Sequence, residues 1–257
     1  MKHENFKKCS QSGFCTRNRN YADSAVAQGA HWKAPYRLDA ASIDFKNGQL
    51  HGNVLKTISN NEQVFLPLVF SFLESGVARV TLDETKRKNG EIELRHDSKI
   101  RKERYNEAEK WAIVGGLEPS SSAELSADNE PGFTKVLYGP DKKFEAIIRH
   151  EPFEVAFRRD GVTHIQFNDR GLINMEHWRQ KKEAPPKPEG EEAAGEEQPA
   201  SETGQDEFNL WDESYGGNTD SKPRGPESVG LDISFPGYEH VFGIPEHADS
   251  MSLKQTR

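Results

Sequence analysis

The sequence is poor in the residues that mark the common classes of reactive site. It has two cysteines in 257 residues, Cys9 and Cys15, whose spacing is neither a Cys-x-x-Cys redox pair nor half of a zinc site with a visible partner. Nine histidines are scattered without His-x-x-x-His or His-Glu-x-x-His spacing, and no Gly-x-Ser-x-Gly elbow presents a nucleophile. We therefore expect no metal ion, no cofactor and no serine-hydrolase site.

Long apolar runs and an excess of positive charge are also missing. No stretch approaches the roughly 18 apolar residues that a membrane span needs, and the first five residues form no apolar signal segment. No Asn-x-Ser/Thr sequon for N-glycosylation occurs. The formal net charge of -8 argues against nonspecific nucleic-acid binding. We expect neither a membrane span nor a nucleic-acid partner.

The sequence does contain many short apolar stretches that alternate with polar residues. Hydrophobic residues make up 33% and charged residues 30%, so part of the length is not expected to enter a core. The alternating stretches are separated by turn residues such as Asn47-Gly48 and Asp160-Gly161, which are typical of hairpins. This pattern predicts a mainly β fold, an antiparallel β-sandwich.

The composition changes along the chain and divides it into four expected parts. These are an irregular N-terminal arm over 1–35, a β-sandwich domain over 36–182, a disordered acidic insertion over 183–207, and returning sandwich strands over 208–257. Within the sandwich, 64–73 is almost wholly apolar, which indicates a strand buried on both faces, although Pro67 demands an edge or a bulge. The spacing over 99–111 permits a short amphipathic helix or turn.

Two stretches, one near each end of the chain, carry a resemblance to a known family. The first is GPESVGLDISF (225–235) followed by HVFGIPEHAD (240–249), in which Pro236-Gly237 makes a turn between two apolar runs. The second is NFKKC (5–9) followed by SGFCTRNR (12–19). Together they closely resemble the glucosidase II branch of glycoside hydrolase family 31, in which they correspond to the stretch before the catalytic barrel and to the mature N-terminus.

The resemblance implies a fold, an activity and partners. The fold would be a sandwich resembling galactose mutarotase domains, which acts as a scaffold for a barrel on a following segment. The whole enzyme would be an exo-acting retaining α-glucosidase of the endoplasmic reticulum lumen, which trims α-1,3-linked glucose from N-glycans of newly made glycoproteins. Its partners would be the remaining catalytic segment of the alpha subunit, the glucosidase II beta subunit and the glucosylated N-glycan. A variable acidic insertion is also a feature of this branch.

Catalytic carboxylates are not expected within these residues. A retaining glycosidase needs two carboxyl groups about 5 Å apart on rigid elements. Glu246, Asp249 and Asp232 suggest an acidic cluster, but such residues are more often polar groups of an interface, and in the family the catalytic aspartates lie farther along the chain. We therefore assign no catalytic residue to this chain and predict that it is inactive alone, while its substrate-binding residues stay unassigned.

Two further assignments follow from the resemblance. The spacing of Cys9 and Cys15 leaves two free thiols and a disulfide about equally favoured, and the luminal setting implied by the family favours the disulfide. The family also places Glu246 and His247 at the junction between sandwich and barrel, although a simple buried hydrogen-bonded pair explains them equally well.

One rival function belongs to another class. A free-standing, non-catalytic carbohydrate-binding or mutarotase-like β-sandwich would have the same fold. It does not account for the match near the C-terminus, where apolar residues such as Val241, Phe242 and Met251 crowd the last expected strand and call for a partner surface.

Overall fold

The structure is a computed structural model that describes residues 6–59, 62–83, 85–88, 91–94, 118–177, 210–222, 225–243 and 250–254. The chain forms two compact units. Unit 1 consists of Met1–Ala27 with Asn174–Gly230, and unit 2 consists of Gln28–Ile173 with Leu231–Arg257. Each unit therefore combines segments that are far apart in the sequence, and each is described by itself.

Unit 2 contains a five-stranded antiparallel sheet. Its strands are β1 (Tyr36–Leu38), β2 (Asp44–Lys46), β3 (Gln49–Ser59), β4 (Glu62–Phe72) and β5 (Ala78–Leu82). The strand order is β1-β3-β4-β5, with β2 also paired to β3. The separate hairpin of β6 (Thr85–Lys88) and β7 (Glu91–Leu94) follows β5. The long β3–β4 hairpin is the centre of this sheet.

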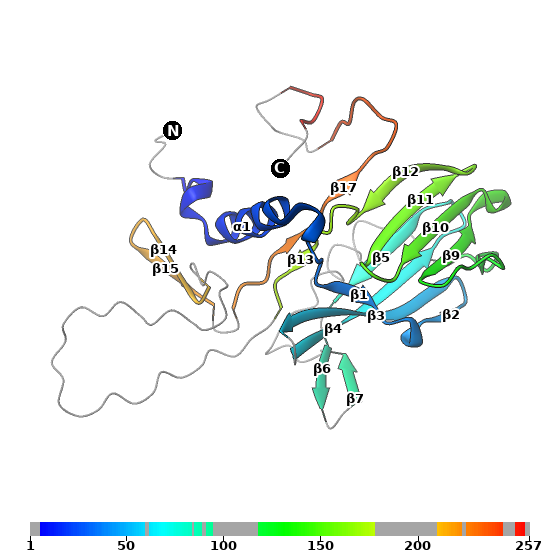
Figure 1. Ribbon diagram of the computed structural model, residues 1–257, viewed down its shortest axis with the longest axis horizontal. Helices are drawn as coiled ribbons and strands as arrows, with labels where there is room; N and C mark the ends of the chain where they lie inside the picture. The colour runs from blue at the N-terminus through cyan, green and yellow to red at the C-terminus, as the bar shows by residue number, and fades with distance from the viewer. Residues whose placement is uncertain are drawn as a thin grey trace. The chain divides into compact units, whose positions relative to one another are not determined.

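A six-stranded antiparallel sheet completes unit 2. Its strands are β8 (Glu124–Leu125), β9 (Phe133–Tyr138), β10 (Phe144–Arg149), β11 (Glu154–Arg159), β12 (Val162–Phe167) and β17 (Ile233–Ser234). The order β17-β12-β11-β10-β9-β8 follows the chain except at β17, which returns from late in the sequence to pair with β12 (Figure 1). The mainly β, antiparallel fold predicted from the alternation is confirmed.

The core of unit 2 lies between the inward faces of the two sheets. Strand β9 shows the alternation clearly, because every second side chain along it is buried. The fully buried side chains include Tyr36, Leu50, Val54, Leu66, Leu68, Phe70 and Phe72 from one sheet and Val136, Ala146, Ile148 and Val155 from the other. The rings of Phe72 and Tyr138 meet with centroids 4.9 Å apart and join β4 to β9. A sandwich results because each sheet buries one apolar face against the other.

The predicted hairpin turns have the expected backbone. Asn47 and Gly48, between β2 and β3, have φ of 51° and 70°, and Asp160 and Gly161, between β11 and β12, have φ of 49° and 78°. Positive φ at both central residues is the mark of a type I′ turn. A Cβ on Gly48 would lie 2.2 Å from the carbonyl oxygen of Ser120, so close packing as well as φ requires glycine there.

Strand β4 differs in one respect from the prediction. Between Phe65 and Phe70 buried and half-buried side chains alternate, and only the end of the strand, Phe70 to Phe72, is buried on both faces. The expected edge at Pro67 is present. The ladder to β5 ends at the Leu68–Leu82 pair, and Pro67 lies just beyond it, where its carbonyl accepts the Asp83 N–H at 3.1 Å. Proline has no N–H to donate, and Pro67 lies where β5 has already ended, so no ladder hydrogen bond to β5 is lost.

Unit 1 is built from one helix and short strand pairs. These are α1 (Gly13–Gln28), the β13–β16 pair (Asn174–Met175 with Val229–Gly230) and the β14–β15 hairpin (Asp212–Tyr215 with Asn218–Ser221). The prediction that 1–35 is irregular is wrong for Gly13–Gln28, which form a helix. Residues 14–28 contain no proline or glycine and include three alanines and two arginines, which favour helix. Few apolar residues mark a buried face, so periodicity gave no signal.

Three predicted features lie outside the described residues: the helix or turn over 99–111, the acidic insertion over 183–207, and residues 244–249. The four-part division of the chain stays a prediction. No helix in the described ranges is long and apolar enough to cross a membrane.

Candidate functional sites

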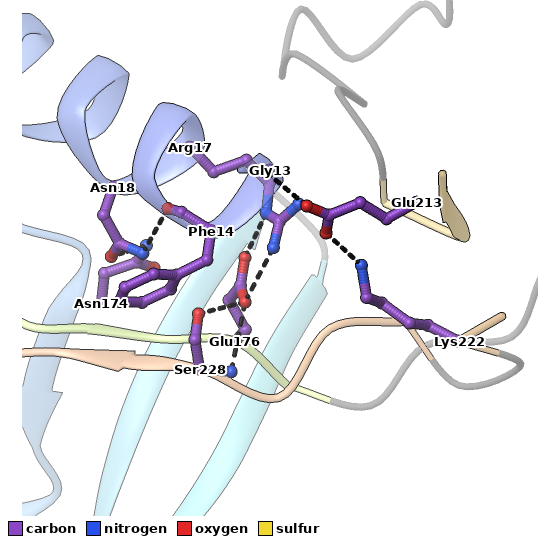
Figure 2. Close-up of polar contacts among 9 residues, drawn as sticks. All are labelled: Gly13, Phe14, Arg17, Asn18, Asn174, Glu176, Glu213, Lys222 and Ser228. Atoms are coloured by element: carbon purple, nitrogen blue, oxygen red, sulfur yellow. Dashed lines mark hydrogen bonds and ion pairs between the residues drawn. The ribbon is translucent and has the colours of Figure 1, made fainter. Parts of the chain in front are cut away.

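The most polar part of unit 1 is a network centred on Glu176 (Figure 2). This carboxylate follows β13 and accepts hydrogen bonds from Arg17 on α1, from Nε at 2.5 Å and from Nη2 at 3.3 Å. It also accepts the backbone N–H of Ser228 at 3.2 Å and the Ser228 hydroxyl. Both charged side chains are buried, with 9% of Arg17 and 5% of Glu176 exposed. Such a pair is stable in the interior because its remaining polar groups are also hydrogen-bonded.

A second carboxylate, Glu213 on β14, lies in the same unit. It accepts hydrogen bonds from Lys7 at 2.6 Å, from Lys222 at 2.7 Å and from the N–H of Gly13 at 3.1 Å. Gly13 is the first residue of α1, where backbone N–H groups have no partner within the helix. Glu213 therefore ties the start of the helix and the lysine before it to the β14–β15 hairpin.

The surroundings of these two carboxylates determine their protonation. Burial alone would raise the pKa of Glu176, but the hydrogen bonds and charge of Arg17 and the hydrogen bonds of Ser228 outweigh it and lower the pKa below its usual value. For Glu213, the hydrogen bonds from Lys222, Lys7 and Gly13 likewise outweigh burial and lower the pKa to about 2. Both groups are ionised at neutral pH. A retaining glycosidase needs one carboxyl group protonated and the other ionised, so the two do not form a catalytic pair.

A hollow of about 390 Å³ lies beside the network in unit 1. Phe14 and Pro226 supply apolar surface, and the charged lining includes Arg17, Glu176 and Lys222. Those three charged groups are already engaged in the ion pairs described above. These charges are therefore already neutralised within the protein and are poorly suited to bind a charged ligand. We interpret the network as a structural connection between α1 and the strands, and call it the clamp.

Asp232, which the sequence suggests as part of an acidic cluster, has a structural position in unit 2. Its carboxylate accepts the N–H groups of Arg170 and Leu172, each at 2.9 Å, and its carbonyl accepts the N–H of Asn168 at 3.0 Å. Burial raises the pKa of Asp232, and the nearby carboxylate of Asp169 raises it further. The two backbone hydrogen bonds lower the pKa but do not outweigh these effects. The group is an anchor for the loop after β12 rather than a free acid.

Unit 2 also carries exposed apolar side chains late in the chain, which we call the C-terminal strip. The strip consists of Leu231, Ile233, Phe235, Tyr238, Phe242 and Met251. The predicted turn at Pro236-Gly237 is confirmed: Tyr238 donates its N–H to the carbonyl of Phe235 at 3.2 Å, and Gly237 has φ of 81°. The predicted second strand at Val241-Phe242 is reduced to a single bridge between Phe242 and Ser252.

The other predicted site residues are placed as follows. Glu246 and His247 lie outside the described residues. Cys9 is an exposed free thiol and Cys15 a half-buried one, so the structure holds no disulfide between them, and their pairing stays a prediction. Among the described residues, no cluster of three histidine, cysteine or acidic side chains is placed to bind a metal ion.

Sequence reasoning missed the two carboxylate clusters. Arg17 and Glu176 are 159 residues apart, and Lys7 and Glu213 are 206 residues apart. No local spacing signals a contact across such distances. The one available hint was Glu176 itself, an acidic residue directly after a short apolar stretch.

Comparisons with known proteins bear on both units. Residues 67–257 match the family model of the glycosyl hydrolase 31 N-terminal galactose mutarotase-like domain. The chain is 34% identical over 253 residues to glucosidase 2 subunit alpha of Schizosaccharomyces pombe, covering 98% of this chain and 25% of the relative. It is 31% identical to neutral alpha-glucosidase AB of Mus musculus, with the same two shares covered.

Solved structures agree with these relatives. A crystal structure of a DNJ-bound glucosidase II alpha subunit is 55% identical, with a TM-score of 0.81, and matches 100% of this chain and 25% of its own. An ER glucosidase II heterodimeric complex, of catalytic subunit and binding domain of the regulatory subunit, matches at 55% identity with a TM-score of 0.80. The chain thus spans about a quarter of the length of the relatives it matches.

Proposed function

The chain belongs to glycosyl hydrolase family 31, and we propose that it is the N-terminal scaffold segment of a retaining, exo-acting α-glucosidase. In the whole enzyme, the activity is removal of α-1,3-linked glucose from N-glycans of newly made glycoproteins. The observation that carries this proposal is the match of 67–257 to the N-terminal mutarotase-like domain of the family, together with relatives about four times as long.

The chemistry of the described carboxylates supports a scaffold role for this segment. Retention of configuration needs a nucleophile and an acid/base about 5–5.5 Å apart and proceeds through a covalent glycosyl-enzyme intermediate. Glu176 and Glu213 are both held ionised by cations, and Asp232 is occupied by backbone N–H groups. These three described carboxylates are thus not offered as catalytic groups, and under the proposal the nucleophile and the acid/base come from the catalytic segment of the longer enzyme, so this chain alone is expected to be inactive.

The partners follow from the same proposal. They are the remaining catalytic segment of the alpha subunit, the glucosidase II beta subunit and the glucosylated N-glycan, and the compartment is the endoplasmic reticulum lumen. A solved relative assembled with the binding domain of a regulatory subunit supports the second partner. Glu246 and His247 are proposed to orient the junction with the barrel, and Cys9 and Cys15 to pair in that oxidising compartment.

The alternative is a free-standing carbohydrate-binding or mutarotase-like sandwich with no hydrolase attached. It accommodates the two sheets of unit 2 equally well. It gives no reason for the exposure of the C-terminal strip, where Phe242 is 65% and Met251 80% exposed. The hydrolase scaffold is the better supported of the two.

The test compares the full-length gene product with the 257-residue chain on an α-1,3-linked glucosyl disaccharide. We expect turnover by the full-length protein, release of glucose in the α configuration as followed by NMR, and no turnover by the short chain. Release of β-glucose would contradict the retaining mechanism. Turnover by the short chain, persisting after every trace of longer protein is removed, would overturn the scaffold assignment.

A further inference from the structure

Unit 1 contains a hollow of about 390 Å³ beside the clamp. Its lining comes from three parts of the unit: α1, the residue directly after β13, and residues between 213 and 228. The volume lies near the lower end of the range of about 300–1,000 Å³ that is typical of small-molecule sites. The hollow is therefore of a size for a small molecule rather than for a protein segment.

The charges of the lining disfavour an ionic occupant. Both cations of the lining are paired, Arg17 with Glu176 and Lys222 with Glu213, so an anionic ligand would have to break an ion pair. Glu227 also lines the hollow and adds a negative charge, which disfavours an anion further. A cationic ligand would compete with Arg17 for Glu176 and with two lysines for Glu213. A neutral molecule has neither disadvantage.

The polar atoms of the lining suit a neutral molecule that is rich in hydroxyl groups. A hydroxyl both donates and accepts hydrogen bonds, so it can bind to a paired carboxylate without displacing the cation. A carboxylate accepts about four hydrogen bonds, and the described residues give Glu213 three, from two lysines and from the N–H of Gly13. The Ser221 hydroxyl donates to a carboxylate across the β14–β15 hairpin at 2.6 Å and can still accept a hydrogen bond.

Phe14 gives the lining an apolar face. Its side chain, in the first turn of α1, is 44% exposed although the buried Arg17–Glu176 pair lies in the same lining (Figure 2). Pro226 adds apolar surface from the segment after β15. A sugar ring has C–H groups on its faces and hydroxyls around its edge. Such a ring can cover Phe14 while its hydroxyls reach the polar atoms of the lining.

We propose that the hollow of unit 1 is a non-catalytic binding site for a neutral sugar ring, a hexose unit of a glycan. The inference goes beyond the proposed function, because the site uses neither catalytic carboxylates nor the catalytic segment. A wholly apolar molecule of the same size would cover the polar lining without hydrogen-bonding to it, which is costly. Because α1 and 225–228 both line the hollow, the bound sugar stabilises unit 1 by mass action.

The experiment uses the full-length protein and three variants. Phe14→Ala removes the ring, and Phe14→Tyr keeps it. Phe6→Ala is the matched control, because Phe6 is an aromatic residue of unit 1 that is 56% exposed and is not part of the lining. Each protein is titrated with methyl α-glucoside, methyl α-mannoside and the anionic methyl α-glucuronide. Hydrogen exchange of peptides from 13–28 and 225–230 is the readout, and peptides from β9 and β10 report any general effect of added sugar as an osmolyte.

The proposal predicts a specific pattern. At least one neutral glycoside protects 13–28 and 225–230 in a saturable way and leaves β9 and β10 unchanged, and the glycoside that binds more tightly shows whether a glucose or a mannose unit is preferred. The glucuronide binds more weakly than either. Phe14→Ala weakens the apparent affinity about tenfold, whereas Phe14→Tyr and Phe6→Ala stay within about twofold of wild type. If Phe14→Ala does not accumulate as folded protein, Phe14→Leu replaces it, with the same sign expected.

Several results would overturn the sugar site. They are the absence of protection at 13–28 and 225–230, equal protection at β9 and β10, and an equal loss of affinity in Phe6→Ala and Phe14→Ala. Tighter binding of the glucuronide than of the neutral glycosides would overturn the assignment of a neutral ligand. Turnover of an α-glucoside is measured separately. A full-length protein without α-glucosidase activity but with saturable protection of unit 1 would refute the proposed function and leave the sugar site standing.

Discussion

The two units of the chain are stabilised by different chemistry. Unit 2 buries aliphatic and aromatic side chains between two sheets, and its contacts include the stacked rings of Phe70 and Phe72, 5.8 Å apart. Among its described residues, unit 1 buries few apolar side chains, and α1 and the residues before it are held to its strands by the Arg17–Glu176 pair and by the two lysines on Glu213. The apolar contacts of unit 2 tolerate exchange of one hydrophobic residue for another. The ion pairs of unit 1 require specific partner residues of opposite charge.

This difference concerns more than composition. Apolar burial is non-directional and insensitive to pH and moderate salt, so a sandwich core is stable under a wide range of conditions. A buried ion pair is stabilising only while both charges are present, because one alone is left desolvated. The stability of unit 1 should therefore depend more strongly on pH than the stability of unit 2.

The largest effect is expected in the sandwich core. Phe72 has 0% exposure and contacts the rings of Phe45, Phe70 and Tyr138. Phe72→Ala should destabilise unit 2 by about 4 kcal/mol, because it removes apolar contact and leaves a cavity. Urea unfolding measures this. Val80→Ala, on a side chain 37% exposed, is the control and should cost below about 0.5 kcal/mol. A similar loss for both would show that the core is not organised as described.

The buried pair of unit 1 should give the next largest effect. Arg17→Met leaves Glu176 buried without its cation and should cost about 3 kcal/mol, whereas the Arg17→Met, Glu176→Leu double variant should recover much of that loss. Hydrogen exchange of α1 peptides reports the change within unit 1. If the double variant loses the sum of the two single losses, the side chains are not coupled and the clamp is refuted.

Lowering the pH should change the stabilities of the two units in opposite directions. The folded-state pKa values of Glu176 and Glu213 lie below their ordinary value of 4.5, so their stabilisation is present above that value and is lost as pH falls, through about 2 for Glu213. Asp232 in unit 2 has the opposite sign: its pKa is raised, so protonation as pH falls relieves a cost and stabilises the fold. Exchange rates corrected for intrinsic pH dependence should show α1 opening before β12. The reverse order would contradict these assignments.

A smaller effect is expected from the cysteines. If Cys9 and Cys15 pair in an oxidising compartment, the short loop should add about 2 kcal/mol to unit 1 and leave unit 2 unchanged. Intact-mass measurement with alkylation, before and after reduction, tests the bond. Cys9→Ser and Cys15→Ser should then each cause the same loss. Two freely alkylated thiols in protein isolated from the lumen would end this prediction.

The smallest effect should come from the acidic insertion. Replacing 183–207 with a short Gly/Ser linker should change the stability of unit 1 by less than about 0.5 kcal/mol, since closure entropy varies slowly with loop length. If the proposed function is correct, turnover of a small α-glucoside by the full-length protein should be kept. Loss of most activity at unchanged folded content would show that the segment does more than connect.

The sequence predicted unit 2 better than unit 1 for a physical reason. Period-two alternation and the turns at Asn47-Gly48 and Asp160-Gly161 are local signals, and they led to the antiparallel sandwich. The apolar crowding at Phe242 and Met251 likewise indicated an exposed strip. Helix α1 lacks an apolar face, and the Arg17–Glu176 contact spans 159 residues, so neither leaves a trace in any short window. Charged contacts between distant segments are visible only after folding.

The discontinuity of unit 1 has a consequence for synthesis on the ribosome. Its helix is translated before its strands, and the last of these strands ends at Gly230, about 200 residues later. At roughly 5–20 residues per second, α1 waits about 10–40 s for its partners. An isolated helix of 16 residues is marginal in water, so the N-terminal segment emerges without a stable structure. Most of the described sandwich strands are translated during that interval, so α1 can be packed into unit 1 only after they have been made.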